Sequence, residues 1–206
     1  METTLPPVAD PADLREALVS RLIEGGHLRT HEVIAAFRVT ERHRFLPGVD
    51  LKAAYVEDAV PIKHDETGEM ISCISAPSIV ATQLEQLGAE SGHKVLEAGA
   101  ATGYNAALVG QLVEPGGHVW TLDVDQDLVD RAQKNLAQAG ASNVTVVLGD
   151  GAAGLPEHAP FDRIHFTVGA GDVPVQILEQ LAPGGRLVLP MRIRGTGTCS
   201  GRPSPG

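Results

Sequence analysis

The stretch over residues 94–104, K-V-L-E-A-G-A-A-T-G-Y, limits the possible folds of this chain more than any other. It reads as an apolar strand that reaches an acidic residue, turns through small residues and enters a helix. Gly99 lets the backbone turn without a Cβ clash. Turns of this kind, at the carboxyl end of a parallel strand, are where open α/β sheets bind nucleotides. Taken alone, the turn is equally well explained by close strand-to-helix packing.

The next predicted strand favours a cofactor site. Residues 118–123 end in Asp123, which lies 20 residues beyond Gly103; an acid that binds ribose hydroxyls is expected at an offset of roughly 20. The dinucleotide pattern G-x-G-x-x-G is not met, because Ala101 and Tyr104 occupy its second and last glycine positions. The spacing E-x-G-x-x-x-G that begins at Glu97 is more typical of an S-adenosylmethionine enzyme than of a nicotinamide enzyme.

From residue 93 onward, strands and helices alternate, which is typical of a parallel sheet covered on both faces. The strands are predicted at residues 94–97, 118–123, 143–148, 163–168 and 186–189. Pro174 is expected to open a last helix with Val175, Leu178 and Leu181 facing inward. Upstream, amphipathic helices are predicted over 13–23 and after Thr30, too short to stand alone and therefore packed on the core.

The 206 residues predict one domain in three parts. Residues 1–92 form its N-terminal helical and substrate-side segment, residues 93–194 the cofactor-binding α/β core, and residues 195–206 a disordered tail.

Composition limits the class of partner. The net charge of −10 and the aromatic content of 3% argue against nucleic acid. Two cysteines and scattered histidines form neither a disulfide framework nor a metal site. With no membrane-spanning run and no signal sequence, a cytoplasmic protein is expected.

Five stretches together resemble the protein-L-isoaspartate O-methyltransferase family over roughly residues 14–191. They are I-S-A-P at 74–77, the turn at 97–104, G-D-G at 149–151, A-P-F-D at 159–162 and L-E-Q-L-A-P-G-G-R-L-V-L-P at 178–190. The resemblance implies a Rossmann-like α/β fold with a mostly parallel sheet. It also implies transfer of a methyl group from S-adenosyl-L-methionine to the carboxylate of isoaspartyl residues in proteins or peptides, a repair-type activity.

The resemblance also assigns roles to individual residues. Ser75 is the catalytic candidate, whose hydroxyl would bind the acceptor carboxylate; a helix N-cap is its alternative role, and the two are compatible. Asp123 would hold the ribose, and Asp150, which alone reads as a turn cap, would face the adenine with Gly151. The cofactor-binding candidates are Glu97, Gly99, Ala101, Gly103, Asp123, Asp150 and Gly151.

Some features depart from the family. The link over residues 62–73 is longer, Cys73 stands where Thr is usual, and Ala101 replaces a customary Gly. Family members continue after the strand at 187–190 into a final strand pair, which is missing here. The exposed edge left by that absence predicts self-association, a partner strand or low stability.

These departures keep other functions open. The first is methylation of a normal aspartate in a dedicated natural-product precursor peptide, favoured by the longer loop. The second is a module that binds the cofactor but is catalytically silent. A nicotinamide oxidoreductase is a remote third.

Overall fold

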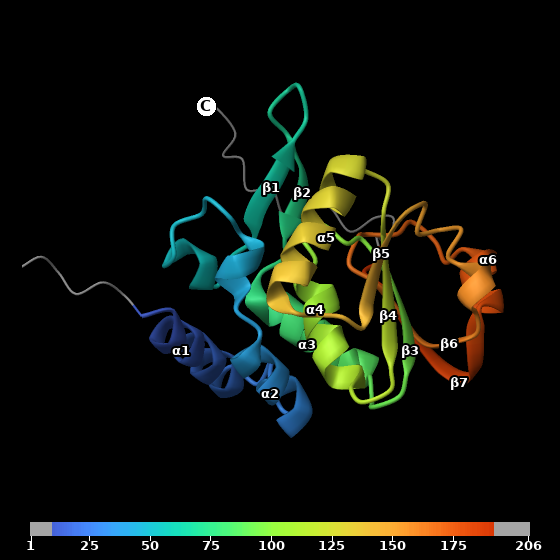
Figure 1. The fold of residues 1–206 in the computed structure, drawn as a ribbon, viewed down its shortest axis with the longest axis horizontal. Coiled ribbons are helices and arrows are strands. Elements are labelled where there is room, and N and C mark those ends of the chain that lie inside the picture. Colours follow the sequence, from blue (N-terminus) through green and yellow to red (C-terminus); the bar gives the residue numbers. More distant parts are fainter. Residues whose placement is uncertain (1–9, 192–206) are drawn as a thin grey trace, which may run out of the picture.

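In the computed structural model, which describes residues 10–191, five strands form one parallel sheet in the order β5-β4-β3-β6-β7 (Figure 1). The strands are β3 (Lys94–Ala98), β4 (His118–Asp123), β5 (Val144–Leu148), β6 (Phe161–Phe166) and β7 (Leu181–Val188). Because all four pairings are parallel, every strand presents its carboxyl end at the same edge of the sheet. The predicted Rossmann-like architecture is confirmed.

Helices cover both faces of this sheet. On one face lie α3 (Pro77–Leu87), α4 (Tyr104–Val113) and α5 (Gln126–Ala139), with α1 (Pro11–Glu24) and α2 (His31–Val39) outside them (Figure 1). The other face is covered by residues 151–160, with the 3₁₀ turn η3 (Pro156–His158), and by α6 (Val175–Glu179). Strand alternation divides the core accordingly: Val95 packs with the first group and Leu96 with the second. The N-terminal helices pack on the core as expected.

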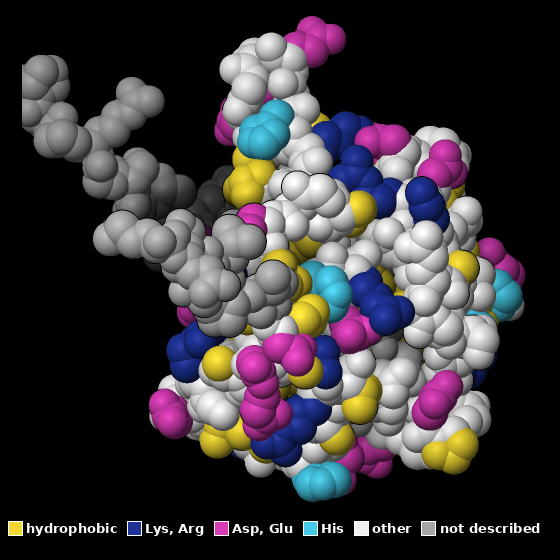
Figure 2. Space-filling model, turned by 60° about the vertical axis from the view of Figure 1, so that its left-hand side comes forward, with side chains coloured by type: hydrophobic (Ala, Val, Ile, Leu, Met, Phe, Trp, Pro, Cys, Tyr) yellow, Lys and Arg dark blue, Asp and Glu magenta, His cyan; other side chains and the backbone are white. Residues whose placement is uncertain are grey.

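A separate antiparallel hairpin precedes the sheet. It consists of β1 (Val60–His64) and β2 (Met70–Ile74), which among residues 10–191 pair only with each other. The 3₁₀ turns η1 (Arg42–Phe45) and η2 (Ala53–Tyr55) lead into it. The tip is a polar turn in which Asp65 Oδ1 accepts hydrogen bonds from the amides of Thr67 and Glu69. The hairpin projects from the body of the protein (Figures 1 and 2).

The last helix differs from the expectation. It is only five residues long, and its buried residue is Ile177, whereas Val175 and Leu178 are 64% and 50% exposed. Leu181, expected on that helix, already begins β7. The predicted tail at 195–206 lies outside the described residues, and the division at residue 92 stays a prediction. Within residues 10–191, no helix combines the length and apolar character of a bilayer span.

Candidate active site

A cleft lies at the carboxyl edge of the sheet and has two hollows. The larger, about 370 Å³, lies between β2 and Ser75 on one side and the turn at 99–105 on the other. The smaller, about 320 Å³, lies between that turn, residues 149–152 and residues 166–174. Gly99 and Asp123 line both hollows, so a ligand that occupied both would pass these two residues.

The turn after β3 is anchored to the end of β4. The amides of Gly99 and Ala100 both donate to the Leu122 carbonyl, at 2.8 and 2.9 Å. Gly99 has a φ of +107°, and a Cβ there would run into Thr167 Oγ1. The Thr167 hydroxyl donates to the carbonyls of Gly99, at 2.7 Å, and Ala98, at 3.1 Å. Only glycine fits this position, because both the backbone angle and the neighbouring threonine exclude a side chain.

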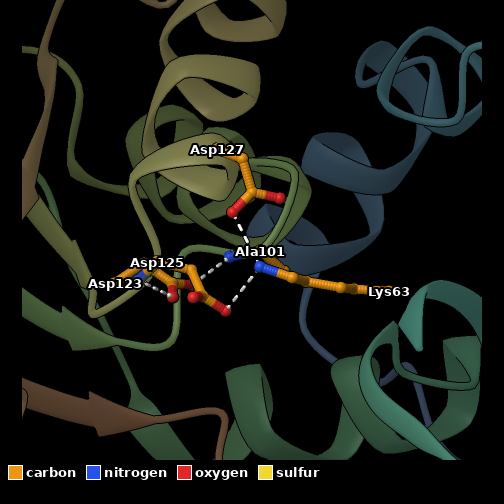
Figure 3. Close-up of polar contacts among 5 residues, drawn as sticks. All are labelled: Lys63, Ala101, Asp123, Asp125 and Asp127. Atoms are coloured by element: carbon orange, nitrogen blue, oxygen red, sulfur yellow. Dashed lines mark hydrogen bonds and ion pairs between the residues drawn. The ribbon is translucent and has the colours of Figure 1, made fainter. Parts of the chain in front are cut away.

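Asp123 faces this turn. Its Oδ2 accepts the Ala101 amide at 2.9 Å and its Oδ1 accepts the Asp125 amide at 3.2 Å (Figure 3). Ala101 is the one described residue other than glycine with a positive φ, at 46°. Each carboxylate oxygen keeps further acceptor capacity. Asp123 therefore lies at the junction of the two hollows and can still accept hydrogen bonds from ligand hydroxyls.

Glu97 and Gly103 line neither hollow. Glu97 is fully buried and accepts hydrogen bonds from Asn105 Nδ2 at 3.0 Å and Thr121 Oγ1 at 3.1 Å. Burial, with a smaller contribution from the charge of Asp123, raises the pKa of Glu97 from 4.5 to about 7. Gly103 is the N-cap of α4, and a Cβ there would lie 2.9 Å from Leu136 of α5.

A buried network of polar side chains, which was not predicted from the sequence, extends from Glu97 to the larger hollow. Asn105 Nδ2 also donates to His165 Nδ1 at 3.1 Å, and His165 Nε2 lies 3.3 Å from Gln83 Oε1. Burial lowers the pKa of His165 to about 4, so the ring is neutral and donates from Nε2 to Gln83. In the sequence, the one indication of this polar network is Asn105, a polar residue directly after the turn.

The larger hollow has unused polar capacity. Among the described residues, buried Asn105 Oδ1 and Thr102 Oγ1 have no hydrogen-bond partner, and both residues line this hollow. Buried polar atoms are rarely left unpaired in folded proteins. These two atoms therefore fit a ligand that brings donors into the cleft, as the ammonium group of a methionine-type cofactor would.

Ser75 lines the opposite wall of the larger hollow. The N-cap of α3 is Ala76, and the Ser78 amide at the helix start donates to Glu57 Oε1 at 2.8 Å. The N-cap role considered for Ser75 is therefore wrong, and its hydroxyl makes no hydrogen bond within residues 10–191. Behind it, the buried Arg42 guanidinium donates from Nη2 to the Ser75 carbonyl at 3.0 Å. That contact fixes the Ser75 backbone and leaves the hydroxyl free.

Asp150 and Gly151 lie in the smaller hollow. Asp150 is exposed, and its Oδ1 accepts the Ala152 amide at 2.8 Å, so it caps the turn after β5. A Cβ on Gly151 would lie 2.5 Å from Ala98 Cβ, so only glycine lets this loop approach β3 so closely. Asp150 thus has the turn-capping role, and it also lies beside the smaller hollow.

The family model described as protein-L-isoaspartate(D-aspartate) O-methyltransferase (PCMT) matches residues 13–198. Relatives named protein-L-isoaspartate O-methyltransferase include one from Methanopyrus kandleri, 45% identical over 178 residues, which cover 86% of this chain and 76% of the relative. Another, from Methanosarcina mazei, is 44% identical over 178 residues, or 85% of this chain and 71% of the relative.

Solved structures agree in fold. One titled protein-L-isoaspartate O-methyltransferase has a TM-score of 0.78 and 34% identity; the match covers 86% of this chain and 55% of that one. This chain thus spans little more than half the length of that structure's chain. A second is a putative protein-L-isoaspartate O-methyltransferase beta-aspartate methyltransferase (PCMT) from Plasmodium falciparum in complex with S-adenosyl-L-homocysteine. It has a TM-score of 0.76 and 20% identity, and the match covers 88% of this chain and 85% of that chain.

Proposed function

Because the chain belongs to the protein-L-isoaspartate O-methyltransferase family, we propose that it transfers the methyl group of S-adenosyl-L-methionine to the carboxylate of L-isoaspartyl residues in proteins or peptides. The observation that carries the proposal is the cleft whose two hollows meet at Gly99 and Asp123, with Ser75 on the facing wall. When bound, the cofactor would supply an electrophilic sulfonium methyl group.

The two hollows suggest how the cofactor is oriented. Asp123 would accept the ribose hydroxyls, and Asp150 and Gly151 in the smaller hollow would border the adenine. The methionine part would then lie in the larger hollow, along Gly99 and Ala101, where Asn105 Oδ1 is free to accept from its ammonium group. Glu97 would act through Asn105, and Gly103 by starting α4, so both support the site without lining it.

The protein needs only to position the acceptor carboxylate, because no proton has to be removed from it. The isoaspartyl carboxylate is already ionised near neutral pH. The Ser75 hydroxyl would donate to one of its oxygens, while the other attacks the methyl carbon in line with the sulfur. Alignment of the three reacting atoms and exclusion of water by the cleft walls would supply most of the rate enhancement. A triad of nucleophile and base is therefore not required.

Paired peptides test the proposal. An isoaspartyl peptide and its aspartyl twin would be incubated with the protein and methyl-labelled cofactor, and base-labile methyl esters counted. We expect esters on the isoaspartyl peptide alone. Turnover of the aspartyl twin would indicate the dedicated-peptide function instead, while cofactor binding without turnover of either peptide would indicate a silent module.

We also propose that the protein self-associates through its sheet edge. β7 pairs with β6 on one side, and no described residue pairs with its other side. Unpaired strand edges are templates for pairing with another chain. A monodisperse monomer in light scattering would contradict this proposal. The cytoplasmic location stays a prediction.

A further inference from the structure

One side chain links the β1–β2 hairpin to the start of α5, beside the cleft. Lys63 Nζ, from β1 of the hairpin, lies 2.7 Å from Asp127 Oδ1 and 3.1 Å from Asp125 Oδ2 (Figure 3). Asp125 is the N-cap of α5 and Asp127 lies in its first turn. These two carboxylates follow Asp123 in the chain at intervals of two residues. Lys63 thereby ties the hairpin to the segment that carries the proposed ribose acid.

The hairpin is itself a wall of the larger hollow. Residues 70–74 of β2, with Ser75, line one side, and Gly99 to Thr102 with Asp123 line the other. The hairpin makes no strand pairing with the main sheet, and it stands out from the body of the protein (Figures 1 and 2). On the face in Figure 2, hydrophobic side chains show only in small groups. Val60 and Ile74 join the base of the hairpin to the core, and the Lys63 pairs are a polar contact farther toward the hairpin tip.

The bridge is suited to opening. The side chains of Lys63, Asp125 and Asp127 are 28%, 39% and 55% exposed. Ion pairs this accessible contribute little to folding and are weakened by salt. Removing the lysine should therefore leave the fold intact and free the outer part of the hairpin, residues 63–72, while Val60 and Ile74 stay in the core.

We propose that Lys63 is a positioning residue that holds the β1–β2 hairpin closed across the cofactor cleft and so controls exchange of cofactor and product. The proposal rests on the proposed function, since it takes the cleft to be the cofactor site. In the closed state the Lys63 pairs keep the outer part of β2, residues 70–73, against the cofactor, while Ser75 stays fixed by its contact with Arg42. When the Lys63 pairs break, the outer part of the hairpin swings away and product leaves.

The first test needs no cofactor. Hydrogen exchange of the amides at 60–74 would be compared in the wild-type protein, Lys63→Ala and Lys63→Arg. Arg38→Ala is the matched control, because it removes another exposed ion pair, Arg38 to Glu16 at 2.8 Å, on α2 and α1 away from the cleft. We expect faster exchange in Lys63→Ala alone, with Lys63→Arg close to the wild type. Equal exchange in all four proteins would overturn the closed hairpin.

The second test measures release. S-adenosyl-L-homocysteine should dissociate several-fold faster from Lys63→Ala than from the wild type, and KM for the cofactor should rise while kcat is unchanged or higher. Raising NaCl from about 0.05 to about 0.5 M should speed release from the wild type more than from the variant. Equal release rates would overturn the control of exchange. Failure of the wild type to bind S-adenosyl-L-homocysteine would count against the proposed function instead, and hydrogen exchange would still decide whether Lys63 closes the hairpin.

Discussion

Replacing Glu97 by Gln should change how the stability of the protein depends on pH. Glu97 is fully buried, and its pKa is raised from 4.5 to about 7 because burial disfavours the charged form. Between these values the folded protein keeps the proton and the unfolded chain has lost it. The contribution of Glu97 to the free energy of unfolding therefore falls as pH rises through that window, and the loss is complete above the folded pKa.

The magnitude follows from the displacement of the pKa. One pH unit is worth about 1.4 kcal/mol of differential proton binding, so the whole window is worth on the order of 3 kcal/mol. A glutamine keeps the shape of the side chain without titrating, since its oxygen can accept from Asn105 and its amide can donate to Thr121 Oγ1. Between about pH 5 and pH 8, the free energy of unfolding of Glu97→Gln should therefore rise by about this amount relative to that of the wild type.

The assay is urea unfolding of the wild type and the variant at pH 5 and pH 8. The difference between their free energies of unfolding is taken at each pH, so that the contributions of all other titrating groups cancel. Glu66→Gln, at the exposed tip of the hairpin, is the matched control and should show no such gain. A wild-type-to-variant difference that is the same at both pH values would refute the reasoning, and would mean that Glu97 titrates alike in the folded and unfolded protein.

Further substitutions test the site directly. Ser75→Ala should lower kcat/KM for an isoaspartyl peptide about 10- to 100-fold with cofactor affinity unchanged, because a hydrogen bond to a charged group is worth about 1.5–3 kcal/mol; unchanged steady-state kinetics would exclude its acceptor role. Asp123→Asn should weaken S-adenosyl-L-homocysteine binding about 10-fold or more in calorimetry for the same reason, and wild-type affinity would show that the ribose is held elsewhere. Gly99→Ala should abolish that binding and lower Tm, because its Cβ meets Thr167. Gly140→Ala, which has a φ of +74° but open space, is the control and should lower Tm less without affecting binding.

Structural features that depend on short stretches of sequence could be predicted. The five strands, the turn after β3 and the position of Asp123 at the end of β4 follow from an alternation of apolar runs, small residues and helix starts. The parallel order then brings the carboxyl ends of neighbouring strands together. The placement of Asp123 opposite Ala101 therefore needed no knowledge of distant contacts.

Side-chain partners far apart in the chain could not be predicted. Glu57 satisfies the start of α3 from 21 residues away, which displaced the local rule that made Ser75 a cap. His165 meets Gln83 across 82 residues, and Lys63 meets Asp127 across 64. No periodicity or spacing records such pairs, because they form only after the sheet and its helices have packed.

The carboxylate of Asp123 has consequences for attempts to redesign cofactor preference. The carboxylate proposed to bind the ribose also accepts the amide of Ala101, whose positive φ disfavours a side chain. On this proposal, one residue determines both the choice of ligand and the shape of the loop. An engineer who wanted this protein to accept an altered nucleoside would have to rebuild the loop along with the acid, since exchanging the acid alone would disturb both.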